Sequence, residues 1–154
     1  MQQQTADQLL TIVTQWRPRL QSLADHTVRH RPAPDRWSIA EVVGHLVDSA
    51  NNNHQRFVRA QFVTALTFAK YEQNEWVRAA AYHSLDWLTL IELWASYNTV
   101  LAHLIRQIPD DQWSTPCTIT PYETCALRFL VSDYVTHLQH HLDRIAERTD
   151  EDAA

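Results

Sequence analysis

The sequence contains a single glycine, Gly44, among its 154 residues. Phosphate-binding P-loops and the G-x-G-x-x-G turn of dinucleotide-binding folds each require several glycines, so both are excluded. The tight turns of all-β folds usually use glycine as well, which argues against a sandwich or barrel. Hydrophobic residues make up 45% of the chain, as in globular proteins. Because the length suits one ordinary domain, we expect a single domain over residues 1–154.

The charge and the sequence ends restrict the partners and the compartment. The net charge is −5, whereas a nucleic-acid-binding protein normally presents a basic face. The N-terminal residues lack the features of a signal peptide, and no stretch approaches the ~18 apolar residues of a membrane span. Cys117 and Cys125 are too few for a disulfide framework and are expected to be small, partly buried residues. We therefore expect a cytoplasmic protein without nucleic-acid or membrane partners.

Apolar residues recur at helical spacing in four long segments. Capping-box patterns, in which a hydroxyl residue precedes Glu or Gln by three positions, predict three of the helix starts. These patterns occupy residues 5–8, 38–41 and 120–123. Asp86 is expected to cap the third helix, which ends at Pro109. The predicted helices cover about residues 5–23, 38–62, 86–108 and 120–145. Pro18 is expected to kink or split the first of them.

Four amphipathic helices in one chain predict an all-α four-helix bundle. Residues 67–83 form a long connection with room for one short helix, and residues 110–119 are predicted to form a loop. The first of these connections is long enough to cross the bundle. An up-up-down-down or related order and a simple meander are therefore both compatible with the pattern. Gly44 inside the second helix indicates a close contact there.

Nine histidines are more than usual, and two pairs have the i,i+4 spacing that lets two rings reach one ion. His26 and His30 lie beside a Pro-rich loop without apolar neighbours, and we expect them in solvent. His137 and His141 point close to the direction of Tyr134 on the last helix, and so toward the bundle interior. Two buried neutral imidazoles on one turn are hard to satisfy without a metal ion or a polar network.

A third inward histidine, His45, lies on the face that the second helix should bury, and it is the candidate for a further ligand. His54 is about 180° from His45 around the helix and should face solvent. His140 is rotated by about 80° from the mean direction of the histidine pair and is interpreted as a boundary residue. His83 and His103 lack inward partners, and no role is expected for them.

Two stretches resemble the signatures of the DinB/YfiT-like superfamily, and a third is similar to a connection in its YfiT-like branch. These are residues 31–49, 133–145 and 71–76, respectively. The resemblance implies a four-helix bundle in up-down-down-up order, with one divalent metal ion held by His45, His137 and His141. Many members of that family form dimers. They include bacillithiol and mycothiol S-transferases, a mycothiol-dependent isomerase and proteins described as metal-dependent hydrolases.

Three imidazole ligands leave the other coordination positions to water or substrate, as in catalytic metal sites. Zinc or nickel is the expected metal, with iron, cobalt or manganese as alternatives. We expect a metal-dependent enzyme that activates a low-molecular-weight thiol for S-transfer. The alternatives are a metal-dependent hydrolase that activates water and a non-catalytic metal-binding module of a stress response. A haem bundle with two histidine ligands is a further alternative.

The catalytic residues remain unassigned at this stage. Five polar residues near the faces of the three histidines could orient the ligands or the substrate, although each also has an ordinary capping or surface explanation. They are Asp48, Ser49, Asn52, Asp133 and Tyr134. The expected partners are a small-molecule substrate and a second copy of the chain in a homodimer.

Overall fold

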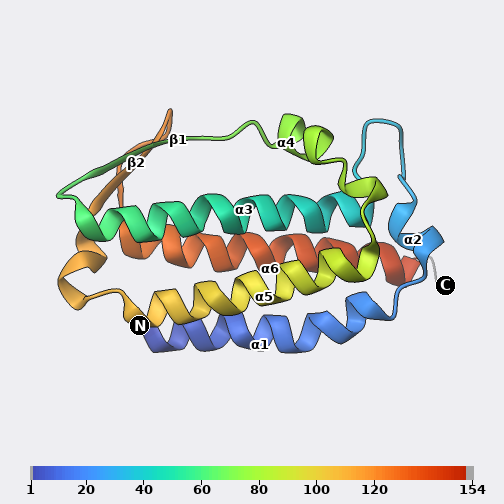
Figure 1. The fold of residues 1–154 in the computed structure, drawn as a ribbon, viewed down its shortest axis with the longest axis horizontal. Coiled ribbons are helices and arrows are strands. Elements are labelled where there is room, and N and C mark those ends of the chain that lie inside the picture. The colour runs from blue at the N-terminus through green and yellow to red at the C-terminus, as the bar shows by residue number, and fades with distance from the viewer. Residues whose placement is uncertain (1, 152–154) are drawn as a thin grey trace.

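Four long helices pack side by side in the computed structural model, which describes residues 2–151 (Figure 1). They are α1 (Gln2–Gln21), α3 (Ile39–Arg59), α5 (Trp87–Gln107) and α6 (Leu127–Glu151). α1 and α6 run in one direction and α3 and α5 run in the other. α1 and α3 each pack against both α5 and α6. The four-helix bundle and its up-down-down-up order are therefore confirmed.

The connection between α3 and α5 returns along the length of the bundle because these two helices point the same way. It contains η1 (Ala60–Phe62), β1 (Leu66–Ala69), α4 (Gln73–Ala80) and η2 (Tyr82–Ser84). In Figure 1 it passes above α3, on the side of the bundle opposite α1. The short helix expected in this connection is α4, whereas β1 was not predicted.

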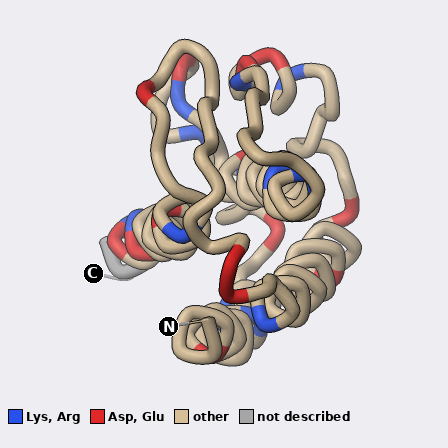
Figure 2. Tube along the Cα trace, turned by 90° about the vertical axis from the view of Figure 1, so that its left-hand side faces the viewer, with Lys and Arg blue, Asp and Glu red and all other residues tan. Residues whose placement is uncertain are grey.

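A small sheet joins the two long connections. The segment between α5 and α6 contains η3 (Asp110–Ser114), β2 (Pro116–Thr120) and β3 (Cys125–Ala126) where a loop was expected. β1 pairs in parallel with β2, from Leu66 opposite Cys117 onward, and β2 pairs antiparallel with β3. Figure 2, which looks along the bundle, shows the connecting segments standing out on the side opposite the N-terminus. Strands this short show no clear alternation of apolar and polar residues in the sequence. Whether these segments form strands is therefore decided by their pairing with one another.

Two of the predicted helix starts are confirmed and two are wrong. Ser38 and Glu41 form the full capping box of α3, and the Asp86 side chain accepts from the backbone N–H of Thr89 at the start of α5. Thr5 lies inside α1, which begins at Gln2. Thr120 is the last residue of β2, and α6 begins only at Leu127. The backbone of Thr120 pairs with Ala69 of β1, so the local pattern does not start a helix there.

α1 continues through Pro18 and ends three residues later at Gln21, after which the five-residue helix α2 (Asp25–Arg29) follows. Pro18 therefore does not split α1. A proline in the last turn removes only one helical hydrogen bond, which the buried Trp16 and Leu20 on either side offset by packing in the core.

Gly44 meets the side chain of Tyr82, which η2 lays against α3. A Cβ atom built on Gly44 would lie 2.1 Å from the Tyr82 ring, so the expected close contact is confirmed. Cys117 is buried and Cys125 is partly buried, and both are free thiols. Among the described residues no helix combines the length and the hydropathy that a membrane span requires.

Candidate metal centre

His45 is positioned by the local structure at the start of α3. The Glu41 side chain accepts from the Ser38 backbone N–H at 2.8 Å, and Ser38 Oγ accepts from the Glu41 backbone N–H at 3.3 Å. Arg31 donates to both carboxylate oxygens of Glu41 and so ties the preceding loop to the helix. This cap sets the helical register, which turns His45 inward, where it is only 1% exposed.

The ring nitrogens of His45, His137 and His141 converge between α3 and α6. Nε2 of His137 lies 3.4 Å from Nε2 of His45 and 3.2 Å from Nε2 of His141. One donor nitrogen from each of the three residues lies within 4.8 Å of the others. His45 is buried, and the other two are half-buried. The inward directions that the sequence predicted for these three rings are therefore present.

The spacing of these nitrogens suits a divalent metal ion. A tetrahedral zinc ion with nitrogen ligands at about 2.0–2.1 Å separates those ligands by roughly 3.3–3.4 Å. The two measured Nε2–Nε2 distances, 3.2 and 3.4 Å, are close to that separation. A neutral imidazole offers one donor and one acceptor, so three Nε2 atoms that face one another cannot all be satisfied by the histidines alone. The group could therefore hold a metal.

The three imidazoles are neutral at physiological pH. Burial, together with the neighbouring His137 and His141, lowers the pKa of His45 from 6.5 to about 3. Burial lowers the pKa of His141 to about 4, again with help from its histidine neighbours. The pKa of His137 is lowered mainly by burial and also by His140. Neutral imidazole is the form that binds metals.

Tyr71 contacts the back of His45 from the segment between β1 and α4. Its hydroxyl lies 3.5 Å from Nδ1 of His45, and its ring stacks near the imidazole at a centroid distance of 6.3 Å. The tautomer that leaves Nε2 free to bind a metal carries its proton on Nδ1, which then donates to the Tyr71 hydroxyl. The Trp37 ring lies 5.1 Å away on another side of His45. These contacts restrict the orientation of the ring.

A cavity of about 850 Å³ adjoins the histidines. It is bounded by α3, α6, the segment from Lys70 to Glu75 and the turn between β2 and β3, and His45 and His137 are among its lining residues. This volume is sufficient for a small organic molecule. The histidine group is therefore accessible to a ligand of that size from one side.

The five polar candidates divide into two sets. Ser49, Asp133 and Tyr134 line the cavity, and the buried Tyr134 donates its hydroxyl hydrogen to Asn98 Oδ1 at 2.5 Å. Asp48 and Asn52 are buried in structural contacts instead. Asp48 Oδ1 accepts from the Tyr82 hydroxyl at 2.6 Å, and burial raises the pKa of this carboxyl. The side-chain amide of Asn52 donates to the backbone carbonyl of Asp48.

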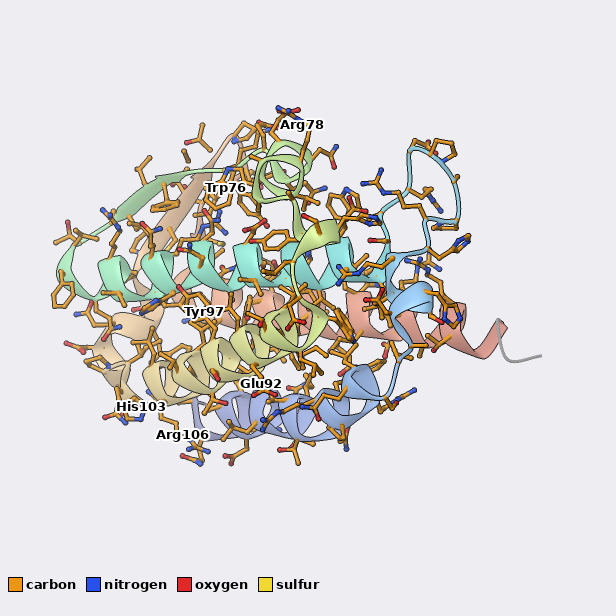
Figure 3. All side chains as sticks on the ribbon, turned by 45° about the vertical axis from the view of Figure 1, so that its right-hand side comes forward. Trp76, Arg78, Glu92, Tyr97, His103 and Arg106 are labelled. Carbon is orange, nitrogen blue, oxygen red and sulfur yellow. The ribbon has the colours of Figure 1, made fainter. Side chains whose placement is uncertain are left out.

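The remaining histidines lie outside the converging group. The expected solvent exposure of His26 and His30 is confirmed. Three more are exposed as well: His83, His103 and His140. The expectation for His54 is wrong, because this residue is half-buried and its Nδ1 lies 3.2 Å from the Tyr97 hydroxyl. α5 packs on that side of α3, and Figure 3 shows Tyr97 on the part of α5 that faces α3.

Sequence reasoning missed several residues of the cavity, among them Asn53, Arg56 and Tyr71. Asn53 and Arg56 follow His45 by eight and eleven positions, which places them within about 80° of it on the helix. That spacing was a readable signal. Tyr71 had no comparable signal in its own segment, because the fold of the crossover brings it to His45.

The fold and the site define a class of protein, a four-helix bundle that brings three histidines from two helices to a cavity of substrate size. The chain belongs to the DinB superfamily, which matches residues 8–145. YfiT from Bacillus subtilis has the same fold, with a TM-score of 0.89 at 19% identity over 99% of this chain and 87% of that one. YfiT is described as "a probable metal-dependent hydrolase with an unusual four-helix bundle topology". None of the curated proteins compared with the chain matches it.

Proposed function

We propose that His45, His137 and His141 hold one divalent metal ion, and that the protein is a metal-dependent enzyme acting on a small molecule in the adjoining cavity. The observation that carries this proposal is the convergence of three Nε2 atoms. Nε2 of His137 lies 3.4 Å from Nε2 of His45 and 3.2 Å from Nε2 of His141. Zinc or nickel suits three imidazoles best, and iron, cobalt or manganese are the alternatives.

The proposed reaction is transfer of a low-molecular-weight thiol to an electrophile. When bound, the metal would lower the pKa of a coordinated thiol or water. The protein's own residues supply the setting: Tyr71 orients His45, and the cavity walls hold the substrate beside the histidines. Three protein ligands leave room for a substrate group in the coordination sphere. The chain is a member of the DinB superfamily, and the resemblance of its sequence to the DinB/YfiT-like signatures implies that thiol S-transferases are among the members, which supports this activity.

Hydrolysis is the second candidate, and it is favoured by the description of YfiT as a probable metal-dependent hydrolase. The same neutral histidines and the same cavity would serve it. The two reactions differ in the nucleophile, which is a thiol in one and water in the other. A comparison of product formation with and without added thiol therefore separates them.

The first experiment is metal analysis of protein purified without an affinity histidine tag. We expect about one divalent ion per chain in the wild-type protein and severe loss in His45→Ala. Full occupancy in His45→Ala would refute the proposed site. A bis-histidine haem protein would instead show a Soret band on purification.

The second experiment tests the reaction on the metal-loaded protein. Cysteine, glutathione, bacillithiol, mycothiol and coenzyme A are each offered with the electrophile monochlorobimane, and ester and amide substrates are offered without thiol. Thiol-dependent conjugation that is lost in His141→Ala supports S-transfer. Thiol-independent hydrolysis supports the second candidate. Metal binding with neither activity would refute both and leave a non-catalytic metal-binding module.

The homodimer stays a prediction. Light scattering of the purified protein at several concentrations tests it, and a mass equal to the 18.0 kDa chain at every concentration would refute it.

A further inference from the structure

A line of polar side chains continues along α3 from His45. Ser49, Asn53 and Arg56 follow it at intervals that keep all four within about 80° of one another on the helix. All four are buried, and all four line the same cavity. Arg56 stands eleven residues beyond His45, which corresponds to about 16 Å along the helix axis. The cavity therefore has a histidine end and an arginine end.

Arg56 is a buried cation without a counter-ion. It is only 9% exposed, and its Nε is buried without a hydrogen-bond partner. Its Nη1 donates to Asn53 Oδ1 over a long 3.4 Å, and its guanidinium lies 5.5 Å from the centre of the Phe68 ring. Within the described part of the chain, no carboxylate forms an ion pair with it.

A buried charge without a partner destabilises the fold, so this arrangement requires an explanation. Burial lowers the pKa of Arg56, yet a guanidinium stays charged at neutral pH. The other cation on the cavity wall, Lys70, already forms an ion pair with Glu72 at 3.1 Å. Three further acidic residues line the cavity, namely Glu75, which pairs with Arg78, and Glu123 and Asp133, and none of them forms an ion pair with Arg56. The Nε–H donor of Arg56 is thus free for a ligand.

We propose that Arg56 binds a carboxylate of the substrate, so that the substrate is an extended small molecule with its reacting group at the histidines and a carboxylate at the far end of the cavity. The planar fork of the guanidinium matches a carboxylate, and the unpaired Nε is one of the donors that such a pair uses. The reacting group belongs to the proposed function, whereas the carboxylate subsite does not depend on a metal.

The test uses 4-phenylbutyrate and its uncharged amide, 4-phenylbutyramide, as probes of equal shape. Binding to ¹⁵N-labelled metal-free protein is followed by NMR, including the Nε–H signal of Arg56. A charge-assisted hydrogen bond corresponds to a difference of about 10- to 100-fold in Kd between acid and amide. We expect this preference in the wild-type protein and a shift of the Nε–H signal on addition of the acid. Equal Kd values for acid and amide would overturn the proposal without any variant being needed.

Arg56→Gln and Arg59→Gln form a matched pair of variants. Arg59 lies one turn further along α3, contacts the same Phe68 ring at 5.9 Å and is exposed. We expect Arg56→Gln to lose the preference for the acid and Arg59→Gln to keep it. Equal loss in both variants would mean that general positive charge attracts the probe, and it would overturn the proposal. Tighter binding of 3-phenylpropylphosphonate than of the carboxylate would overturn the assignment to a carboxylate.

The outcomes separate this inference from the proposed function. If the metal-free protein selects the acid through Arg56 but no metal binds the histidines, the carboxylate subsite stands and the proposed function fails. If the histidines bind a metal but acid and amide bind equally, the subsite fails and the metal proposal stands.

Discussion

Replacing Gly44 with alanine tests the contact that lays η2 on α3. The added Cβ would lie 2.1 Å from two atoms of the Tyr82 ring, so the ring must move. Overpacking of this kind costs about 1–3 kcal/mol. A displaced Tyr82 also releases its 2.6 Å hydrogen bond to Asp48, whose other carboxylate oxygen is already buried without a partner. Loss of a hydrogen bond to a buried charged group costs about 1.5–3 kcal/mol.

Alanine also favours the helix by about 0.5–1 kcal/mol over glycine, which opposes these losses. The net expectation is that Gly44→Ala lowers the free energy of unfolding by about 2–5 kcal/mol. For a chain of this size this corresponds to a thermal midpoint that is lower by at least about 4 °C. Chemical denaturation followed by circular dichroism measures the free energy directly.

A second background decides whether Tyr82 is the cause. In a Tyr82→Gly protein both the ring and the Cβ of residue 82, which would lie 2.7 Å from the added Cβ, are gone, so the same Gly44→Ala change should stabilise the helix by up to about 1 kcal/mol. The sign of the effect therefore reverses between the two backgrounds. A Gly44→Ala protein as stable as the wild type would refute the reasoning. So would an equal destabilisation with and without the Tyr82 ring.

The other predictions concern the site and the start of α3. His141→Ala should lose most of the bound metal, because only two ligands remain, whereas His26→Ala should keep it, because His26 is exposed. Elemental analysis measures the metal content. Equal loss in both variants would show that the inward direction of a histidine does not identify it as a ligand. Metal-free protein should lose stability as the pH falls from 6.5 toward 4, because the pKa of His45 is lowered to about 3 and the unfolded chain binds protons first. The slope is at most about 1.4 kcal/mol per pH unit for each such histidine, and a stability that rises on acidification would contradict it. Ser38→Ala should lower the free energy of unfolding by about 1 kcal/mol in the same denaturation assay, and no change would show that the cap is dispensable.

The sequence alone was sufficient wherever the decisive interactions are local. The start of α3 was predictable because the Ser38–Glu41 capping box is completed within four residues. The inward directions of His45, His137 and His141 were predictable because a helix turns by about 100° per residue and the apolar positions mark the core side. The close contact at Gly44 was predicted too, although its partner was not.

Tertiary structure decided what depends on segments far apart in the chain. The capping pattern at Thr120 failed because β2 pairs with β1, which lies some fifty residues earlier. His54 was expected in solvent, but α5 brings Tyr97 against it. The crossover carries Tyr71 to His45 and closes the cavity over Arg56. Helical periodicity states which way a side chain points, but only the packing of distant segments decides what it meets there, because those contacts leave no local pattern in the sequence.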